Sequence, residues 1–277
     1  MIQIITIRKL IQSALEEDIG AGDITTDAVL TGNEAGKARA FAKAELVAAG
    51  IAVFRETFLL LDGRLRFTGY YEDGQVVEKG GVLAEISGNL GSILTAERVA
   101  LNLFQRMCGI ATVTRHYVDE IKGTGAKILD TRKTAPGLRC LDKYAVRIGG
   151  GMNHRFGLHD GVLIKDNHIA AAGGISQAIT RVRGRIPHTL KIEVEVKNLS
   201  ELEEALVSGA DIVMLDNMKV GDMRKAVAVV NRRVPLEASG NVTLENVRII
   251  AETGVDFISV GALTHSVPAS DISLTIE

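Results

Sequence analysis

The last third of the sequence alternates apolar strand patterns with helical patterns at an almost constant spacing. Each predicted strand ends in a polar residue or a glycine, at Glu195, Asp216, Ser239 and Gly261, which are separated by 21, 23 and 22 residues. A strand that returns parallel to its neighbour needs a long crossover, and a helix usually supplies it. The spacing therefore predicts parallel strands whose C-terminal ends meet at one edge, as in an α/β barrel.

The number of strands limits the kind of barrel. Apolar runs at 128–129 and 162–164 precede the runs of the last third, which gives about six strong strands where a regular TIM barrel has eight. We therefore predict an α/β fold with an irregular, incomplete TIM-like barrel. An open, doubly wound parallel sheet is the alternative.

The segment 127–168 concentrates cations in a nearly neutral chain, which has 32 Lys and Arg against 34 Asp and Glu. Guanidinium groups bind carboxylate and phosphate through paired hydrogen bonds, and Lys adds a compact charge, so this cluster predicts a site for a small polyanion. A solvated basic face is the alternative, but such a face is not normally built around a triple glycine like that at 149–151. The cluster consists of Arg132, Lys133, Arg139, Lys143, Arg147, His154, Arg155 and Lys165.

Polar groups at the other strand ends complement this cationic cluster. The segments 239–241 and 261–263 follow the last two strands, where barrels often bind phosphate through backbone N–H groups, although plain strand-to-helix turns are the alternative. Glu195 and Asp216 could act as general acid and base, hold a divalent ion or hydrogen-bond sugar hydroxyls. Glu193 lies on the same strand face as Glu195, because side chains alternate along a strand, and is a candidate supporting ligand.

The N-terminal part of the chain follows a different pattern of short strands, tight turns and helices. Apolar residues recur at three- and four-residue spacing over 6–17, which indicates an amphipathic helix. We predict an α+β domain of the open-faced sandwich type over 1–110, which the C-terminal tail 267–277 joins. The barrel domain is predicted over 111–266.

Local sequence signals predict two helix starts. A long helix is expected over 95–121, with its N-terminus near Thr95 and an interruption at Gly109. In the barrel, Ser200 and Glu203 have the spacing of a capping box and predict the start of a helix there.

Composition argues against several classes of protein. A net charge near zero argues against a nucleic acid or an anionic membrane held by bulk electrostatics. Cys108 and Cys140 are too few for a disulfide framework, and their spacing matches no metal motif. The N-terminal residues become charged too early for a secretory signal, and no apolar run reaches membrane-spanning length. We expect a cytoplasmic protein with no nucleic-acid or membrane partner.

Several motifs occur in one order along nearly the whole chain, including ALEEDIGAGDITT at 14–26, TAERVALNLFQRMCGIAT at 95–112, DTRKT at 130–134, NHRFGLHD at 153–160, LIKDNH at 163–168, MLDN at 214–217, ASGN at 238–241 and SVGALTHS at 259–266. Together they resemble the quinolinate phosphoribosyltransferase family, the carboxylating nicotinate-nucleotide pyrophosphorylases. Two positions depart from the family pattern, because Ala135 stands where Thr is expected and Asn241 where a second Gly is common. Asn tolerates the left-handed conformation that Gly adopts.

The resemblance implies an activity and its reactants. The enzyme would be a pentosyltransferase that moves the phosphoribosyl group of 5-phosphoribosyl 1-diphosphate to quinolinate and releases CO₂. The products would be nicotinate mononucleotide and pyrophosphate, in NAD biosynthesis. Mg²⁺ would be the cofactor, bound mainly through the diphosphate, with Glu195 and Asp216 as candidate ligands.

The resemblance also implies a set of site residues and an oligomer. Lys133, Lys165, Glu195 and Asp216 are the candidate catalytic residues. A homodimer, or a higher oligomer, would donate Arg98 of one subunit to the site of the other. The candidate substrate-binding residues are Arg98, Thr131, Arg132, Lys133, His154, Arg155, Lys165, Glu195, Asp216, Ser239, Gly240, Asn241, Gly261, Ala262 and Leu263.

Three alternative functions fit parts of the pattern. A related protein associated with molybdate transport would share the fold, but a different sequence around Lys165 would be expected. A barrel aldolase could use Lys165 to form a Schiff base with a carbonyl substrate. The surrounding arginines argue against this function, because they suit anionic ligands and because the lysine that attacks a carbonyl must be uncharged. A nucleotide-binding module would bind a phosphoribosyl ligand without turnover.

Overall fold

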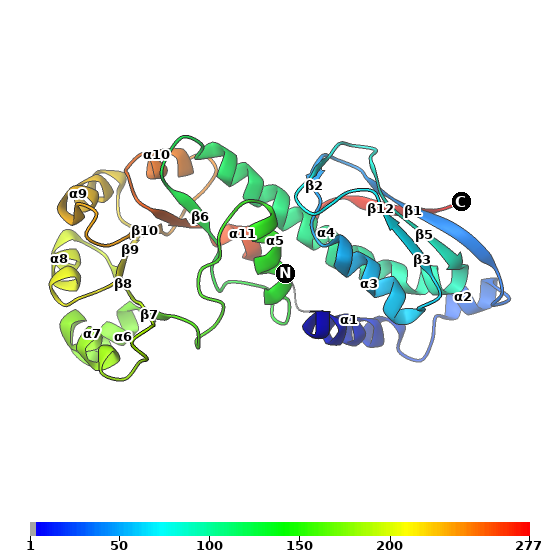
Figure 1. The fold of residues 1–277 in the computed structure, drawn as a ribbon, viewed down its shortest axis with the longest axis horizontal. Coiled ribbons are helices and arrows are strands. Elements are labelled where there is room, and N and C mark those ends of the chain that lie inside the picture. The colour runs from blue at the N-terminus through cyan, green and yellow to red at the C-terminus, as the bar shows by residue number, and fades with distance from the viewer. Residues whose placement is uncertain (1–3) are drawn as a thin grey trace. The chain divides into compact units, whose positions relative to one another are not determined.

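The computed structural model describes residues 4–277, and contacts divide the chain into two compact units (Figure 1). The second unit consists of 116–134 and 151–265. The first unit consists of 1–115, 135–150 and 266–277, of which 1–3 lie outside the described residues. Residues 135–150 thus belong to the first unit, although they fall within the range predicted for the barrel.

The first unit is built on an antiparallel sheet with strand order β12-β1-β5-β3. The C-terminal tail supplies the edge strand β12, which pairs with β1 over Ala38 to Ala42. A separate two-stranded pair joins β2 and β4. The strands are β1 (Ala35–Ala42), β2 (Leu46–Val47), β3 (Arg66–Gly69), β4 (Val76–Val77), β5 (Val82–Asn89) and β12 (Ile272–Ile276).

Helices cover this sheet and complete the core of the first unit. Phe54 and Phe104 stack with ring centroids 4.7 Å apart, and Phe58 meets Phe54 edge to face. These rings belong to one buried cluster with the apolar face of β1 and β5, so aromatic and aliphatic packing joins helix to sheet. The helices are α1 (Ile4–Ile19), α2 (Ile24–Val29), α3 (Ile51–Leu61), α4 (Leu90–Glu120) and α5 (Arg139–Ile148).

The long helix α4 differs from its prediction at two points. It begins at Leu90 rather than near Thr95, because the side chain of Asn89 accepts a hydrogen bond from the Ser92 N–H at 2.9 Å and caps the first turn. It also runs through Gly109 without interruption. A Cβ at position 109 would lie 2.2 Å from the carbonyl oxygen of Pro268, so glycine is required there by a close backbone approach.

The second unit contains a parallel sheet of six strands in the order β6-β11-β10-β9-β8-β7. This confirms the predicted α/β fold. Among the described residues β6 and β7 are the two edges of the sheet, and beyond β6 the chain adds only a single parallel bridge between Leu129 and Met152. The strands are β6 (Lys127–Leu129), β7 (Val162–Ile164), β8 (Ile192–Val196), β9 (Ile212–Asp216), β10 (Leu236–Ser239) and β11 (Phe257–Ser259).

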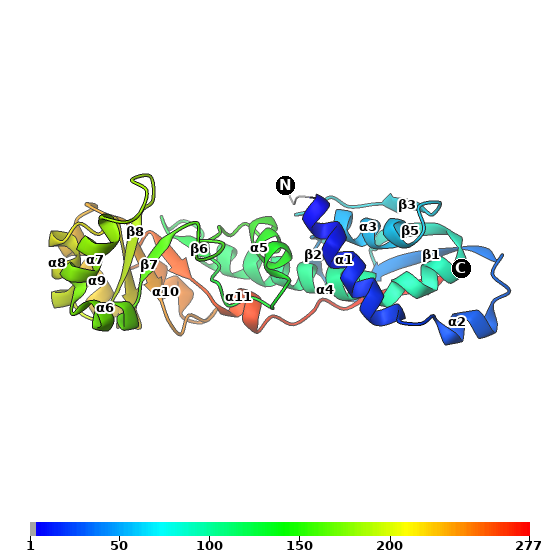
Figure 2. The same cartoon turned by 90° about the horizontal axis from the view of Figure 1, so that it is seen from below.

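Helices connect these strands, and α7, α8 and α9 lie together along one face of the sheet (Figures 1 and 2). The start of α8 is two residues earlier than predicted. Asn198 caps it by accepting from the Glu201 N–H at 3.0 Å, so the predicted capping box of Ser200 and Glu203 is wrong. The helices are α6 (Asp166–Ala172), α7 (Ile175–Arg183), α8 (Leu199–Val207), α9 (Val220–Val230), α10 (Val247–Ala251) and α11 (Ala262–His265).

No helix within residues 4–277 is long and apolar enough to cross a membrane.

The close approach of Gly109 to Pro268 generates a stability prediction. Gly109→Ala should lower the free energy of unfolding by about 1–3 kcal/mol, because the new methyl group meets backbone rather than a flexible side chain. Gly221→Ala in α9 is the matched control, because its Cβ meets open space and alanine favours the helix. Urea denaturation of both variants checks this, and equal stability of the two would contradict it.

Candidate active site

A cavity of about 710 Å³ opens in the second unit at the C-terminal ends of the parallel strands. It brings together nearly all the residues that the sequence singled out, from segments that are distant in the chain. The predicted residues that line it are Thr131, Arg132, Lys133, His154, Arg155, Lys165, Glu195, Asp216, Ser239, Gly240, Asn241, Gly261 and Ala262.

Two residues of the candidate substrate-binding set do not line this cavity, and neither do Arg139, Lys143 and Arg147 of the cationic cluster, which lie on α5 in the first unit. Leu263 is fully buried in α11. Arg98 is exposed on α4 in the first unit. The cavity instead includes Asn217 and His265, which the sequence motifs contained but to which no role was assigned.

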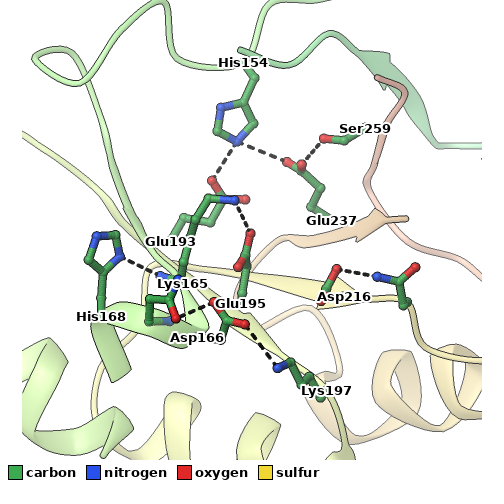
Figure 3. Close-up of polar contacts among 12 residues, drawn as sticks. His154, Lys165, Asp166, His168, Glu193, Glu195, Lys197, Asp216, Glu237 and Ser259 are labelled. Carbon is green, nitrogen blue, oxygen red and sulfur yellow. Dashed lines mark hydrogen bonds and ion pairs between the residues drawn. The ribbon is translucent and has the colours of Figure 1, made fainter. Parts of the chain in front are cut away.

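The ends of β7 and β8 hold a cation and an anion side by side. Lys165 Nζ lies 2.9 Å from Glu195 Oε1, with the Lys165 side chain about half exposed (Figure 3). The backbone N–H of Lys165 donates to His168 Nδ1 at 3.0 Å, so the His168 ring braces this turn. A Schiff-base lysine needs a free amine, whereas Lys165 Nζ is held in an ion pair with Glu195, so this geometry argues against the aldolase alternative.

Arg155 is the most constrained cation of the cavity. Its Nη1 donates to the Gly161 carbonyl at 3.0 Å, while its buried Nε has no hydrogen-bond partner among the described residues. Burial, followed by the charge of Arg132, lowers the pKa of Arg155. An anion between these guanidinium groups would satisfy the buried donor and relieve the repulsion, which fits the predicted polyanion site.

The cavity also has supporting residues that the sequence analysis missed. Asp130 is fully buried and accepts from the His154 N–H at 2.9 Å and from Asn153 at 2.5 Å. Glu237 is 2% exposed and hydrogen-bonds Ser259 (Figure 3). A carboxylate inside the apolar strand β10 was a visible signal, because a charged residue is almost never fully buried without a partner.

Amide side chains connect the C-terminal ends of β9 and β10. Asn217 donates to Asp216 Oδ1 at 2.9 Å and accepts from Asn241 at 3.1 Å. Asn217 and Asn241 have positive φ values of 54° and 51°, so Asn241 adopts the left-handed conformation that Asn tolerates. Gly240 between these strands has a φ of 103°, and a Cβ there would lie 2.2 Å from Asn217 Oδ1.

The loop after β6 completes the cavity. Lys133 is held by its backbone, since its N–H donates to Thr131 Oγ1 at 3.0 Å and its carbonyl accepts from Thr264 Oγ1 at 2.8 Å. A Cβ on Gly261 would lie 3.0 Å from the His265 ring and 3.4 Å from Lys133 Cδ. Glycine at this position therefore lets a second cation and a histidine approach the strand end.

Cations, carboxylates and glycine-bordered loops line one cavity at the C-terminal ends of parallel strands, which is the arrangement of an α/β-barrel enzyme site. Family models cover most of the chain. Residues 23–108 match the N-terminal domain of quinolinate phosphoribosyl transferase, and residues 110–275 match its C-terminal domain. The chain belongs to the quinolinate phosphoribosyltransferase family.

Individual relatives agree with the family models. A protein of Bacillus subtilis named probable nicotinate-nucleotide pyrophosphorylase (carboxylating) is 45% identical over 98% of this chain and 93% of its own length. A Synechocystis protein of the same name is 49% identical over 96% of this chain and 91% of its length. The solved structure of the nicotinate-nucleotide pyrophosphorylase from Francisella tularensis has a TM-score of 0.96 and 43% identity, and the match covers 100% of this chain and 98% of that one.

The contact between Gly240 and Asn217 predicts the effect of one added methyl group. Gly240→Ala should displace Asn217 and weaken binding of 5-phosphoribosyl 1-diphosphate by about tenfold or more, because the loop and Asp216 lose their common support. Gly209→Ala is the control. Position 209 also has a positive φ, of 85°, so alanine is strained there as well, but its Cβ meets open space and the variant should bind 5-phosphoribosyl 1-diphosphate with wild-type affinity. Titration calorimetry measures both affinities, and wild-type affinity in Gly240→Ala would contradict the prediction.

Proposed function

We propose that this chain transfers the phosphoribosyl group of 5-phosphoribosyl 1-diphosphate to quinolinate, with release of CO₂ and pyrophosphate and formation of nicotinate mononucleotide. The observation that carries the proposal is the meeting of three groups in one cavity: the cations around Arg155, the carboxylates Glu195 and Asp216, and the loops at Gly240 and Gly261. The names of the relatives support the same reaction, a step of NAD biosynthesis.

The cationic side suits the acceptor. Quinolinate is a planar dicarboxylate, and a planar guanidinium binds a carboxylate through two parallel hydrogen bonds. Arg155 and Arg132 would hold one carboxylate, with the buried Nε of Arg155 as one donor. Lys133 and Lys165 would position the carboxylate that leaves. When quinolinate binds, Lys165 would exchange part of its pairing with Glu195 for the substrate anion.

The strand-end loops and carboxylates suit the donor. Backbone N–H groups at 239–241 and 261–263 would bind the 5′-phosphate, and Glu195 and Asp216 would face the ribose. The lone pair of the quinolinate nitrogen attacks the ribose carbon as pyrophosphate leaves, so the transition state resembles an oxocarbenium ion that nearby carboxylates stabilise. The nitrogen then becomes a pyridinium, whose positive charge stabilises the electron pair that the departing CO₂ leaves on the adjacent ring carbon. A proton taken up at that carbon, from water or a neighbouring acid, completes nicotinate mononucleotide.

The donor set of the cavity fits Mg²⁺, because this ion prefers carboxylate and phosphate oxygens. Glu195 is already paired with Lys165, and Asp216 with Asn217. We therefore propose that the ion binds mainly through the diphosphate, with Glu195 and Asp216 as supporting ligands. When bound, it would neutralise charge on the leaving pyrophosphate.

Substrate choice tests the proposed function. With 5-phosphoribosyl 1-diphosphate and Mg²⁺, the protein should convert quinolinate and release CO₂ and nicotinate mononucleotide in equal amounts. Nicotinate should be a poor substrate, because it lacks the second carboxylate and leaves part of the cationic cluster unpaired. Comparable turnover of nicotinate, or binding of both substrates without any product, would exclude this assignment.

We further propose a homodimer in which each site takes Arg98 from the other subunit. Arg98 is exposed on α4 in the first unit, within the motif that resembles the family, whereas the cavity lies wholly in the second unit. A two-fold interface allows such an exchange, because the same surfaces meet twice.

Mixed dimers test this arrangement. Arg98→Ala and Lys165→Ala homodimers should each be nearly inactive. Reassembly of an equal mixture would place both substitutions in one site of each mixed dimer and leave its second site intact, so about a quarter of wild-type activity should return. Mass labels on the two variants verify that subunits exchange. If they exchange and activity stays at the level of the parents, Arg98 does not serve the neighbouring site.

A further inference from the structure

The ring of His154 is turned toward the protein at both of its nitrogens. Nε2 lies 2.8 Å from Glu193 Oε2, and Nδ1 accepts a hydrogen bond from the Arg155 N–H at 2.8 Å. A nitrogen that accepts carries no proton, so the neutral ring has its proton on Nε2 and donates it to Glu193. His154 was expected to bind substrate directly, yet its polar atoms instead connect strand β8 to the backbone of Arg155.

A second carboxyl group, that of Glu237, lies beside this pair (Figure 3). Glu237 Oε2 is 3.8 Å from His154 Nε2, and Ser259 donates to the other oxygen. Glu193 and Glu237 are only 5% and 2% exposed, and one oxygen of each lies within 4.8 Å of the other, so two negative charges here would repel each other strongly. Burial, followed by the charge of Glu193, raises the pKa of Glu237 well above its usual range.

A buried oxygen of Glu193 indicates where a proton would be held. Glu193 Oε1 is buried and has no hydrogen-bond donor among the described residues. The side chains of Glu193 and Glu237 lie within hydrogen-bonding reach of each other. A proton on Glu237 would let it donate to Glu193, while Glu193 Oε2 stays with His154 Nε2.

The same three residues also have the composition of a metal site, since a ring nitrogen and one oxygen of each carboxyl group lie within 4.8 Å of one another. A metal on His154 Nε2 would require the ring proton to move to Nδ1. That nitrogen already accepts from the Arg155 N–H, so the proton has no place there. The geometry therefore favours a shared proton over a metal ion.

We propose that Glu193 and Glu237 are positioning residues, which hold His154 as the Nε2–H tautomer and thereby fix the backbone that presents Arg155 to the acceptor. The backbone N–H of His154 also donates to Asp130, directly after β6. This network joins β6, β8 and β10 to the segment 151–161 and holds that segment in place by polar bonds. The proposal rests on the proposed function, because Arg155 is the expected anchor for quinolinate.

Two isosteric substitutions separate this role from simple packing. Glu237→Gln keeps a neutral group that can donate to Glu193, so its KM for quinolinate should stay within about threefold of wild type. Glu193→Gln replaces a group that accepts from both His154 and Glu237 by an amide, whose NH₂ group cannot accept. Its KM for quinolinate should therefore rise about 10- to 100-fold. The KM for 5-phosphoribosyl 1-diphosphate should change little in either variant. Glu85→Gln, whose partners Lys37 and Arg39 lie in the first unit, is the control for loss of a half-buried, paired carboxylate elsewhere.

The ¹⁵N resonances of the His154 ring provide a readout that does not depend on turnover. The wild type and Glu237→Gln should show a protonated Nε2 and an unprotonated Nδ1, and Glu193→Gln should lose this pattern. Equal effects of the two glutamine variants on quinolinate KM, or a ring protonated at Nδ1, would overturn the proposal, as would a stoichiometric metal ion in the purified protein. If the wild type shows the expected tautomer but does not use quinolinate, the proposed function fails and the tautomer assignment stands.

Discussion

The parallel register of β8, β9 and β10 is the constraint on which the candidate site depends. Glu195 pairs with Met214, and Asp216 pairs with Ser239, so the polar residues that end each strand lie at one edge of the sheet. The same alternation that places apolar side chains in the core directs these groups into the cavity. A slip of one residue in any of the three strands would turn its polar group away from the cavity and an apolar residue toward it.

The sequence predicted the elements whose signals are local and repeated. The spacing of Glu195, Asp216, Ser239 and Gly261 identified the parallel strands, and the resemblance added the cavity residues between them. The predicted starts of α4 and α8 were wrong. Asn89 and Asn198 cap these helices, whereas Thr95 and Ser200 a few residues later gave a similar sequence pattern. Caps depend on backbone conformation, which residue type specifies only weakly.

Contacts across long sequence separations were the part that could not be predicted. The pairing of His154 with Glu193 spans 39 residues, and that of Glu237 with Ser259 spans 22. Each of these residues taken alone fits a surface position or a satisfied core position. Only the fold shows that two buried carboxyl groups and one imidazole lie next to one another. The free-energy cost of ionising any one of them therefore depends on the protonation of the others.

An incomplete barrel has two free strand edges, which in many proteins would template pairing with another chain. Here both edge strands, β6 and β7, are only three residues long. The bridge from Leu129 to Met152 occupies part of the β6 edge, and a segment with several charged side chains, 153–160, separates it from β7. Short edges protect a sheet against aggregation, so this fold can leave its barrel open without presenting a long template for β-sheet growth.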